Sequence, residues 1–213
     1  QEYCEKAIKI DPRNTNTLNI LGITFIDVGE NEKAIICYEK LISIDPNSID
    51  SINNLASLFQ KFKFDNQIKD NKIKYKKLIL FLLRSNTVDH KKIFHNVRSA
   101  LLVNIDNSQL KTVLDSNSSL LSDEIVQNLL NEELLQLVMQ KSLLADVFLE
   151  KLLTRLRGDL LFALEGSDKN ILKDYSNFII SLAEQCWLNE YVYIDSEKEN
   201  NVINKLKNKI END

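Results

Sequence analysis

A chain of 213 residues that is 44% apolar and 27% charged has an ordinary soluble composition and can bury one or two cores. Only 4 glycines and 2 prolines argue for an almost entirely helical protein, and apolar runs such as Leu78 to Leu83 are too short to cross a bilayer. The net charge of -4 is unevenly spread, because residues 61–102 carry 11 basic and 3 acidic side chains and residues 103–213 carry 11 and 19. Three widely spaced cysteines without a CxxC pair indicate neither disulfides nor zinc, and favour a reducing, cytoplasmic setting.

The two ends of the sequence predict that it is part of a longer protein. The chain opens at Gln1 without an initiator methionine or signal-like segment, in a stretch typical of a repeat's second helix. It closes at Asp213 without a helix cap.

Residues 15–47 have the pattern of a helical hairpin. Leu18, Leu21 and Phe25 share one helical face, and Gly29 then breaks the periodicity before a second helix that stops ahead of Pro46. One such hairpin cannot bury its apolar face alone, so a neighbouring copy at a fixed period is expected.

The neighbouring copies occur at a period of 34 residues. Residues 4–12 parallel residues 38–46, and the apolar positions of the first helix recur in residues 52–59. In this period the sequence resembles the tetratricopeptide repeats, whose pattern is a large apolar residue, Leu-Gly, an aromatic, a small residue, an aromatic and a closing proline. The matching residues are Leu18, Leu21, Gly22, Phe25, Ala34, Tyr38 and Pro46, with Leu41 departing from the usual Ala. Gly22 and Ala34 are small because two helices are expected to cross closely there.

The resemblance implies an all-α solenoid with a partial first repeat in 1–13, a full repeat in 14–47 and a degenerate or capping repeat in 48–77. In this family the first helices line a concave groove that binds a peptide or protein partner. The groove positions carried onto this sequence are Asn19, Ile23, Ile26, Asn53, Asn54 and Ser57. Asparagine amides suit an extended peptide because they offer donors and an acceptor to its backbone. The alternative is that these asparagines are solvated polar positions, and the basic residues that clamp a C-terminal carboxylate in some relatives are not evident.

Lysines crowd the degenerate repeat and interleave with Phe62, Phe64 and Tyr75. Cations and rings together could form a nucleic-acid surface. The stronger interpretation is that these rings, with Ile68 and Ile73, cover the last repeat while lysine stems lie over apolar surface. Nucleic acid is therefore a weaker alternative than an acidic protein surface or the chain's own acidic C-terminal part.

Residues 78–213 are expected to form an all-helical connector domain that precedes a missing C-terminal domain. His90 and His95 flank an apolar helical stripe but are five residues apart, which does not suit a metal site on one helix face. Asp146 is expected to cap a long helix with a leucine stripe, and a further stripe from Tyr175 to Tyr191 includes Cys186 and Trp187. Cys186 is expected to be a buried structural cysteine and not a nucleophile.

A second resemblance covers about residues 134–194. The runs 152–157 (LLTRLR) and 182–193 (LAEQCWLNEYVY) are similar to the helical segment of bacterial proteins that join tetratricopeptide repeats to a class I methyltransferase using S-adenosylmethionine. Gly158 replaces a basic residue of that segment and Trp187 replaces Phe. The resemblance implies a parent enzyme, in which Asn189 and Glu190 would dock the following domain or contribute to a site formed with it; capping and surface solvation are the alternative.

No catalytic or metal-binding residue is assigned in this chain. The cofactor site of a class I methyltransferase needs a strand followed by a glycine-rich turn, and Gly22, Gly29, Gly158 and Gly166 form no such cluster. The sequence therefore predicts a protein-binding module without a cofactor, or alternatively the substrate-recruiting part of a methyltransferase whose S-adenosylmethionine site lies beyond residue 213.

Overall fold

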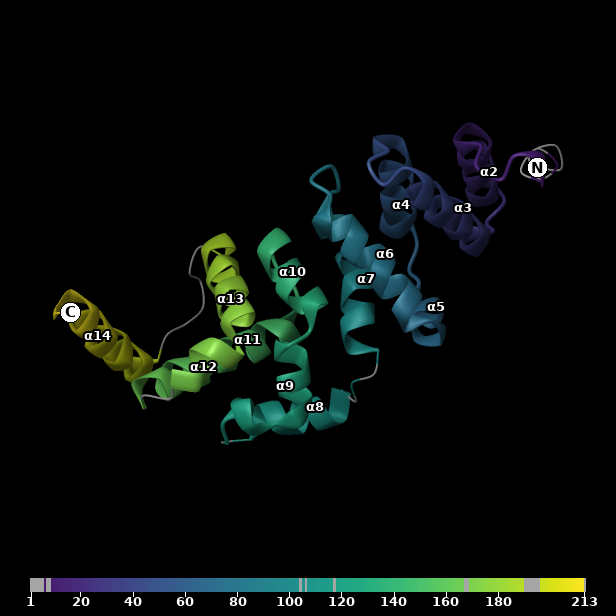
Figure 1. Cartoon of the computed structure of the whole chain (residues 1–213). Coiled ribbons are helices and arrows are strands. Elements are labelled where there is room, and N and C mark those ends of the chain that lie inside the picture. Colours follow the sequence, from purple (N-terminus) through teal and green to yellow (C-terminus); the bar gives the residue numbers. More distant parts are fainter. Residues whose placement is uncertain are drawn as a thin grey trace. The chain divides into compact units, whose positions relative to one another are not determined.

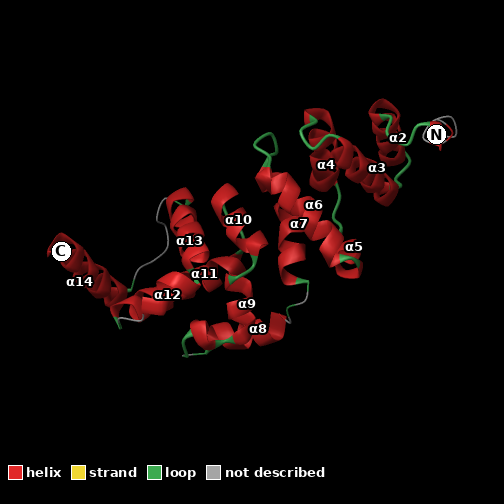
Figure 2. Ribbon diagram, in the orientation of Figure 1, coloured by secondary structure: helices red, strands yellow, loops and turns green. Residues whose placement is uncertain are grey.

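The computed structural model describes residues 6, 9–103, 105, 107–116, 118–166, 169–189 and 196–212. Within these ranges the regular structure consists of α-helices and one short 3-10 helix, with no strand, which confirms the all-α fold class (Figures 1 and 2). None of these helices is both long and apolar enough to cross a membrane.

The chain divides into two compact units, residues 1–103 and 104–213. We expected a boundary after Lys77, but that position lies inside helix α6 (Lys72–Arg84).

The predicted hairpin opens unit 1. Its helices are α2 (Thr15–Asp27) and α3 (Asn31–Ile44), joined by a turn in which Gly29 has a φ of 80°, a backbone conformation that favours glycine. Asn14 caps α2 by accepting a hydrogen bond from the Thr17 amide at 2.9 Å.

The two helices of the hairpin cross closely at Gly22, as the sequence predicts. A Cβ atom at this position would lie 2.8 Å from Cζ of Tyr38, whose side chain is fully buried. Burial raises the pKa of Tyr38 to about 12, with smaller contributions from Cys37 and Asp27.

The rest of unit 1 consists of α4 (Ile49–Lys61), α5 (Asp65–Asp70), α6 and α7 (His90–Leu102). The repeat pattern predicts a single helix after α4, but the structure has two, α5 and α6. They are separate because Asn71 interrupts the helix, and its side chain caps α6 by accepting a hydrogen bond from the Lys74 amide. The rings of Phe59, Phe64 and Tyr75 pack together beneath this break, with centroids 5.1–6.2 Å apart. Helix α7 then packs against α4, α5 and α6.

The longest helix of the described part of unit 2 is α11 (Val147–Glu165), which contacts α8, η1, α12 and α14, while α10 and α13 pack against each other. Asp146 caps α11 by accepting from the amides of Phe148 and Leu149, as predicted. The other elements are α8 (Asn107–Asp115), the 3-10 helix η1 (Leu120–Ser122), α9 (Glu124–Leu130), α10 (Glu133–Lys141), α12 (Lys169–Asp174), α13 (Ser176–Leu188) and α14 (Glu197–Asn212).

Two side chains of α11 fix the connection between α8 and η1. The Arg155 guanidinium donates to the carbonyl oxygens of Leu114, Ser116 and Ser118. One turn along α11, the Asp159 carboxylate accepts from the Leu120 amide at 2.6 Å. These bonds satisfy the Leu114 carbonyl at the end of α8 and three backbone groups of the connection that follows it.

Helix α14 packs on α11 through a largely buried ion pair. Arg157 Nη2 lies 3.1 Å from Glu199 Oε1, and the two side chains are 15% and 9% exposed. The other oxygen of Glu199 accepts from the Ser196 amide, while Ser196 Oγ accepts from the Glu199 amide, so the pair also forms a capping box. A Cβ atom on Gly158 would lie 3.0 Å from Glu199 Oε1, which shows that the glycine makes room for this carboxylate.

The face that α13 buries differs from the predicted one. Its buried residues are Phe178, Ser181, Leu182 and Gln185. Trp187 is 71% exposed and Cys186 is half-buried, so the expectation that both belong to a buried stripe is wrong. The polar residues are buried because α10 supplies partners: Gln140 donates to Ser181, and the Gln185 amide nitrogen, oriented inward, donates to the carbonyls of Met139 and Ser142.

Candidate peptide-binding groove

The first helices of the two repeats, α2 and α4, contact each other in unit 1, and both pack against α3. Their buried residues face α3 and the core, and include Leu18, Leu21, Gly22 and Phe25 on α2 and Ile52, Leu55, Ala56 and Phe59 on α4. All six predicted groove residues lie outside these buried stripes. Asn53 and Ile23 are exposed, and Asn19, Ile26, Asn54 and Ser57 are half-buried.

Two of the predicted asparagines are brought together across the repeat boundary. Nδ2 of Asn54 donates to Oδ1 of Asn19 at 2.8 Å, although the two residues are 35 positions apart in the sequence. This bond orients both amides and leaves Nδ2 of Asn19 as a donor and Oδ1 of Asn54 as an acceptor. A donor and an acceptor held side by side match the N–H and C=O groups of an extended peptide backbone.

The remaining groove candidates supply a mixed surface around this amide pair. Ile23 is 42% exposed, so it offers apolar area on the turn that follows Asn19. Asn53 and Ser57 extend the polar part along α4. The structure places these side chains on the non-buried faces of two packed helices. Among the described residues, no side-chain hydrogen bond joins the other four candidates to one another as Asn19 and Asn54 are joined.

Helix α7 buries residues at the same relative positions as α2 and α4, but it follows α4 at a spacing longer than 34 residues. The sequence analysis did not predict this relation. Ile93, Val97 and Ala100 stand 41 residues after Ile52, Ala56 and Phe59, and all three are buried. The extra residues come from the broken pair α5 and α6. Because of these extra residues, α7 does not fit a fixed period of 34 residues, and its relation to α4 is evident only from the buried positions.

Asn96 holds α7 against the end of α4. Its Nδ2 donates to the carbonyl oxygens of Phe59 at 2.8 Å and Phe62 at 2.9 Å, and its Oδ1 accepts from the Phe64 amide at 2.9 Å. The side chain is 1% exposed. Asn96 occupies the position that Leu21 and Leu55 hold in α2 and α4. An amide at a position that is otherwise apolar is the feature of the sequence that could have indicated a buried hydrogen-bonded side chain.

The two histidines have partners within unit 1. A ring nitrogen of His90 lies 2.9 Å from the Ser85 carbonyl, and Nε2 of His95 lies 3.1 Å from Oδ1 of Asp65. Ser99 also donates to Asp65, and this hydrogen bond lowers the pKa of the carboxyl, with a smaller effect from His95. Because both side chains bind the carboxylate, His95 is not placed to activate the Ser99 hydroxyl.

Over the described part of the chain, no three His, Cys, Asp or Glu side chains are grouped as they would be around a metal ion.

The Lys-rich segment 61–77 buries most of its rings. Phe64 and Tyr75 lie in the core of unit 1, where they cannot stack on bases, while Ile73 is 73% exposed, contrary to the expectation that it covers the repeat. Lys74 forms an ion pair with Glu39 at 2.7 Å. The buried rings therefore agree with the interpretation that they cover the last repeat, and not with a nucleic-acid surface.

The interdomain candidates are only partly described. Asn189 is the half-buried C-cap residue of α13, where its backbone amide bonds the carbonyls of Gln185 and Trp187. Glu190 lies outside the described residues. This position of Asn189 agrees with the capping alternative, and its proposed docking role stays a prediction.

Comparisons with known proteins bear on part of the chain. Residues 15–48 match the family described as tetratricopeptide repeat. A segment of 79 residues, 37% of this chain, is 29% identical to the uncharacterized protein ycf37 of Pyropia yezoensis and covers 43% of that relative's length. No solved structure was found to match the chain. The match and the packed hairpin together show that residues 15–48 form a tetratricopeptide repeat.

Proposed function

We propose that this chain is a protein-binding module, and that α2 and α4 hold an extended peptide segment of a partner protein. The observation that carries the proposal is the Asn19–Asn54 hydrogen bond, because it presents one amide donor and one amide acceptor side by side. The tetratricopeptide repeat at residues 15–48 supports the same function, since stacked helical repeats provide extended binding surfaces.

The groove is tested by selecting random displayed peptides on the whole chain and measuring the affinity of the enriched peptides by calorimetry. Asn19→Ala and Asn54→Ala should each weaken binding about fivefold, because each removes about 1 kcal/mol of hydrogen bonding. Asn66→Ala is the matched control, since Asn66 is an exposed amide on α5, away from the groove. Peptides that bind all three variants as tightly as the unaltered chain would place their site elsewhere and overturn the proposal.

A second candidate function rests on the resemblance of residues 134–194 to the connector of tetratricopeptide-repeat methyltransferases. In that case unit 1 recruits a protein substrate for a catalytic domain in a longer protein. Titration of S-adenosylmethionine into this chain and into a longer protein that contains it distinguishes the two functions. Binding to the longer protein alone supports the recruiting role, and binding to neither leaves an adaptor. The cytoplasmic setting stays a prediction.

A further inference from the structure

The faces of α2 and α4 that hold the six groove candidates carry no charged side chain. Residues 15–26 and 51–60 contain neither an acidic nor a basic residue, although 27% of the whole chain is charged. The charged residues of these two helices lie at their ends, at Asp27, Asp50 and Lys61. The middle of the groove is therefore uncharged over about 18 Å of α2 and about 15 Å of α4.

The second helices of the same repeats differ from the first helices in this respect. Helix α3 carries Glu32, Lys33, Glu39 and Lys40, none of which is buried. Helix α6 carries five basic residues, Lys72, Lys74, Lys76, Lys77 and Arg84. The absence of charge thus belongs to the groove side of the repeats and not to the composition of the repeats as a whole.

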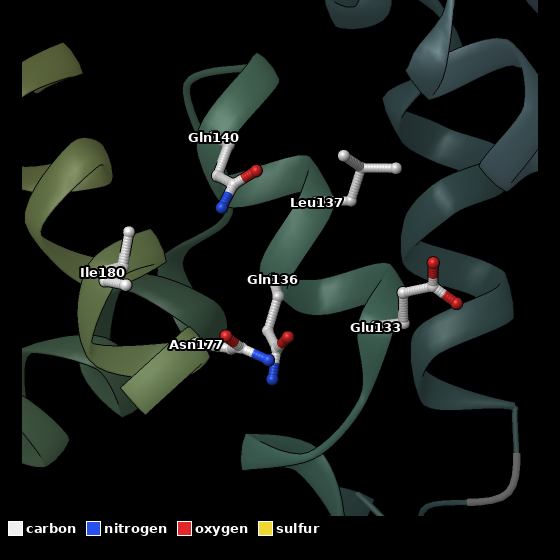
Figure 3. Close-up of a pocket in the computed structure, with 6 residues that line it drawn as sticks. All are labelled: Glu133, Gln136, Leu137, Gln140, Asn177 and Ile180. Atoms are coloured by element: carbon white, nitrogen blue, oxygen red, sulfur yellow. The ribbon is translucent and has the colours of Figure 1, made fainter. Parts of the chain in front are cut away.

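Hollows elsewhere in the structure also have charged residues in their linings. The cleft between α10 and α13 in unit 2 is lined by Glu133 on α10 and Ile180 on α13, among others (Figure 3). The hollow beside the turn of the hairpin is lined by acidic and basic residues, and so is the hollow where the end of α8 meets α11. These surfaces differ from the uncharged groove.

Equivalent positions of the two repeats form rows that cross from α2 to α4. Asn19 and Asn53 are 34 residues apart, and so are Ile23 and Ser57. Ile23 is 42% exposed and Ser57 is half-buried. Packed helices lie about 8–10 Å apart, and an extended chain rises about 3.3 Å per residue, so about three peptide residues would pass from one helix to the next. Alternate side chains of such a peptide point toward the groove.

The uncharged face restricts which side chains can point toward it. A charged side chain held there would lose water without meeting an opposite charge. The central part of a protein interface is, in general, depleted of charged residues. We propose that the groove binds an extended segment whose inward-facing side chains are uncharged, with an aliphatic or aromatic side chain over Ile23. This inference rests on the proposed function and names the class of its ligand.

The dependence of binding on salt tests the inference on the unaltered chain. The probes are the displayed peptides enriched on the whole chain, measured by calorimetry at 50 and 500 mM NaCl. We expect the dissociation constant to change by less than about twofold, because no ion pair is screened. One of the two alternating sets of peptide positions should contain Asp, Glu, Lys and Arg at least about fivefold less often than the unselected library. Binding that weakens about tenfold with salt would overturn the inference.

Three substitutions of Ser57 test the sign of the charge on the ligand. Ser57→Gln has nearly the size of a charged side chain without its charge, and it serves as the reference. Relative to it, Ser57→Glu and Ser57→Lys should each weaken binding at least about threefold, because the peptide would cover a charge that it cannot pair. Opposite effects of the two charges would show a charged ligand and overturn the inference. Asn66→Lys, on α5, is the control and should leave the affinity unchanged.

Asn19→Ala and Asn54→Ala separate this inference from the proposed function. If the enriched peptides lose affinity in both variants but carry charges at both sets of alternating positions, the groove stands and only its uncharged ligand is overturned. If no enriched peptide depends on the two asparagines, the groove and its ligand class are both overturned.

Discussion

Asn96 is buried in unit 1, and its hydrogen bonds join α7 to the end of α4 and to the residue that precedes α5. Asn96→Ala would leave the carbonyls of Phe59 and Phe62 and the amide of Phe64 without this partner. We expect a loss of about 3 kcal/mol in the free energy of unfolding, because buried polar groups left unpaired cost about 1–3 kcal/mol each. Urea denaturation measures the change, and Asn53→Ala, on the exposed face of α4, should change it by less than about 0.5 kcal/mol. Equal losses for the two variants would contradict the role of Asn96.

Gly158 is one of the two positions, with Trp187, at which the sequence differs from the segment that it was said to resemble, and the structure gives a reason for a glycine there. Ala is the better helix former by about 1 kcal/mol, so Gly158→Ala in an open position would stabilise α11. Here the new Cβ would lie 3.0 Å from Glu199 Oε1, and we expect it to displace that carboxylate and loosen α14. Hydrogen exchange of the α14 amides should become faster. Slower exchange would show that the carboxylate moves aside without cost.

At the scale of elements, α14 is joined to α11 by a largely buried titratable contact, the Arg157–Glu199 ion pair. Burial alone would raise the pKa of Glu199, but hydrogen bonds from Ser196 and Arg157 outweigh it and lower the pKa below its usual value of 4.5. A carboxyl with a lowered pKa in the folded protein stabilises it above the unfolded pKa, and this contribution is lost as the pH falls through the folded value. We therefore expect α14 to loosen upon acidification below about pH 4.5.

Hydrogen exchange measured across this pH range tests the contact. In Glu199→Gln the α14 amides should exchange faster at neutral pH and show no further change, beyond intrinsic exchange, upon acidification. Lys205→Gln serves as the control, because the Lys205–Glu165 ion pair is more exposed and should contribute little. If Glu199→Gln keeps the pH dependence of the unaltered chain, the ion pair does not hold α14.

The repeat hairpin and the long helix α11 were predictable, whereas the break between α5 and α6, the helix α14 and the face that α13 buries were not. The hairpin of α2 and α3, the cap at Asp146 and the leucine stripe of α11 follow from periodicity and capping chemistry. Helix α13 is apolar around most of its circumference, so periodicity does not select a face. The choice depends on α10, whose Gln140 and backbone carbonyls pair with Ser181 and Gln185. Such partners are distant in sequence and leave no local signal.

For the whole molecule, two compact units with separate cores predict two unfolding events in calorimetry. Asn96→Ala should lower one transition and Glu199→Gln the other, by roughly 4–8 °C per kcal/mol for units of about 100 residues. A single transition that both substitutions shift equally would show that the units unfold as one. The sequence placed the division after residue 77 because the repeat pattern decays from Gln60 and a leucine-rich helix follows from about Lys77. It could not show that α7 adds a further helix to unit 1.

Trp187, which points into solvent from α13, provides an intrinsic fluorescence probe. It is the single tryptophan of the sequence, it is 71% exposed, and it lies seven positions after Ile180, on the same helical face. Its emission in the folded protein should already resemble that of a solvated indole, so unfolding changes the wavelength little. A ligand that covers this face of α13 should shift the emission to shorter wavelength, and occupancy could thus be followed by intrinsic fluorescence without any label.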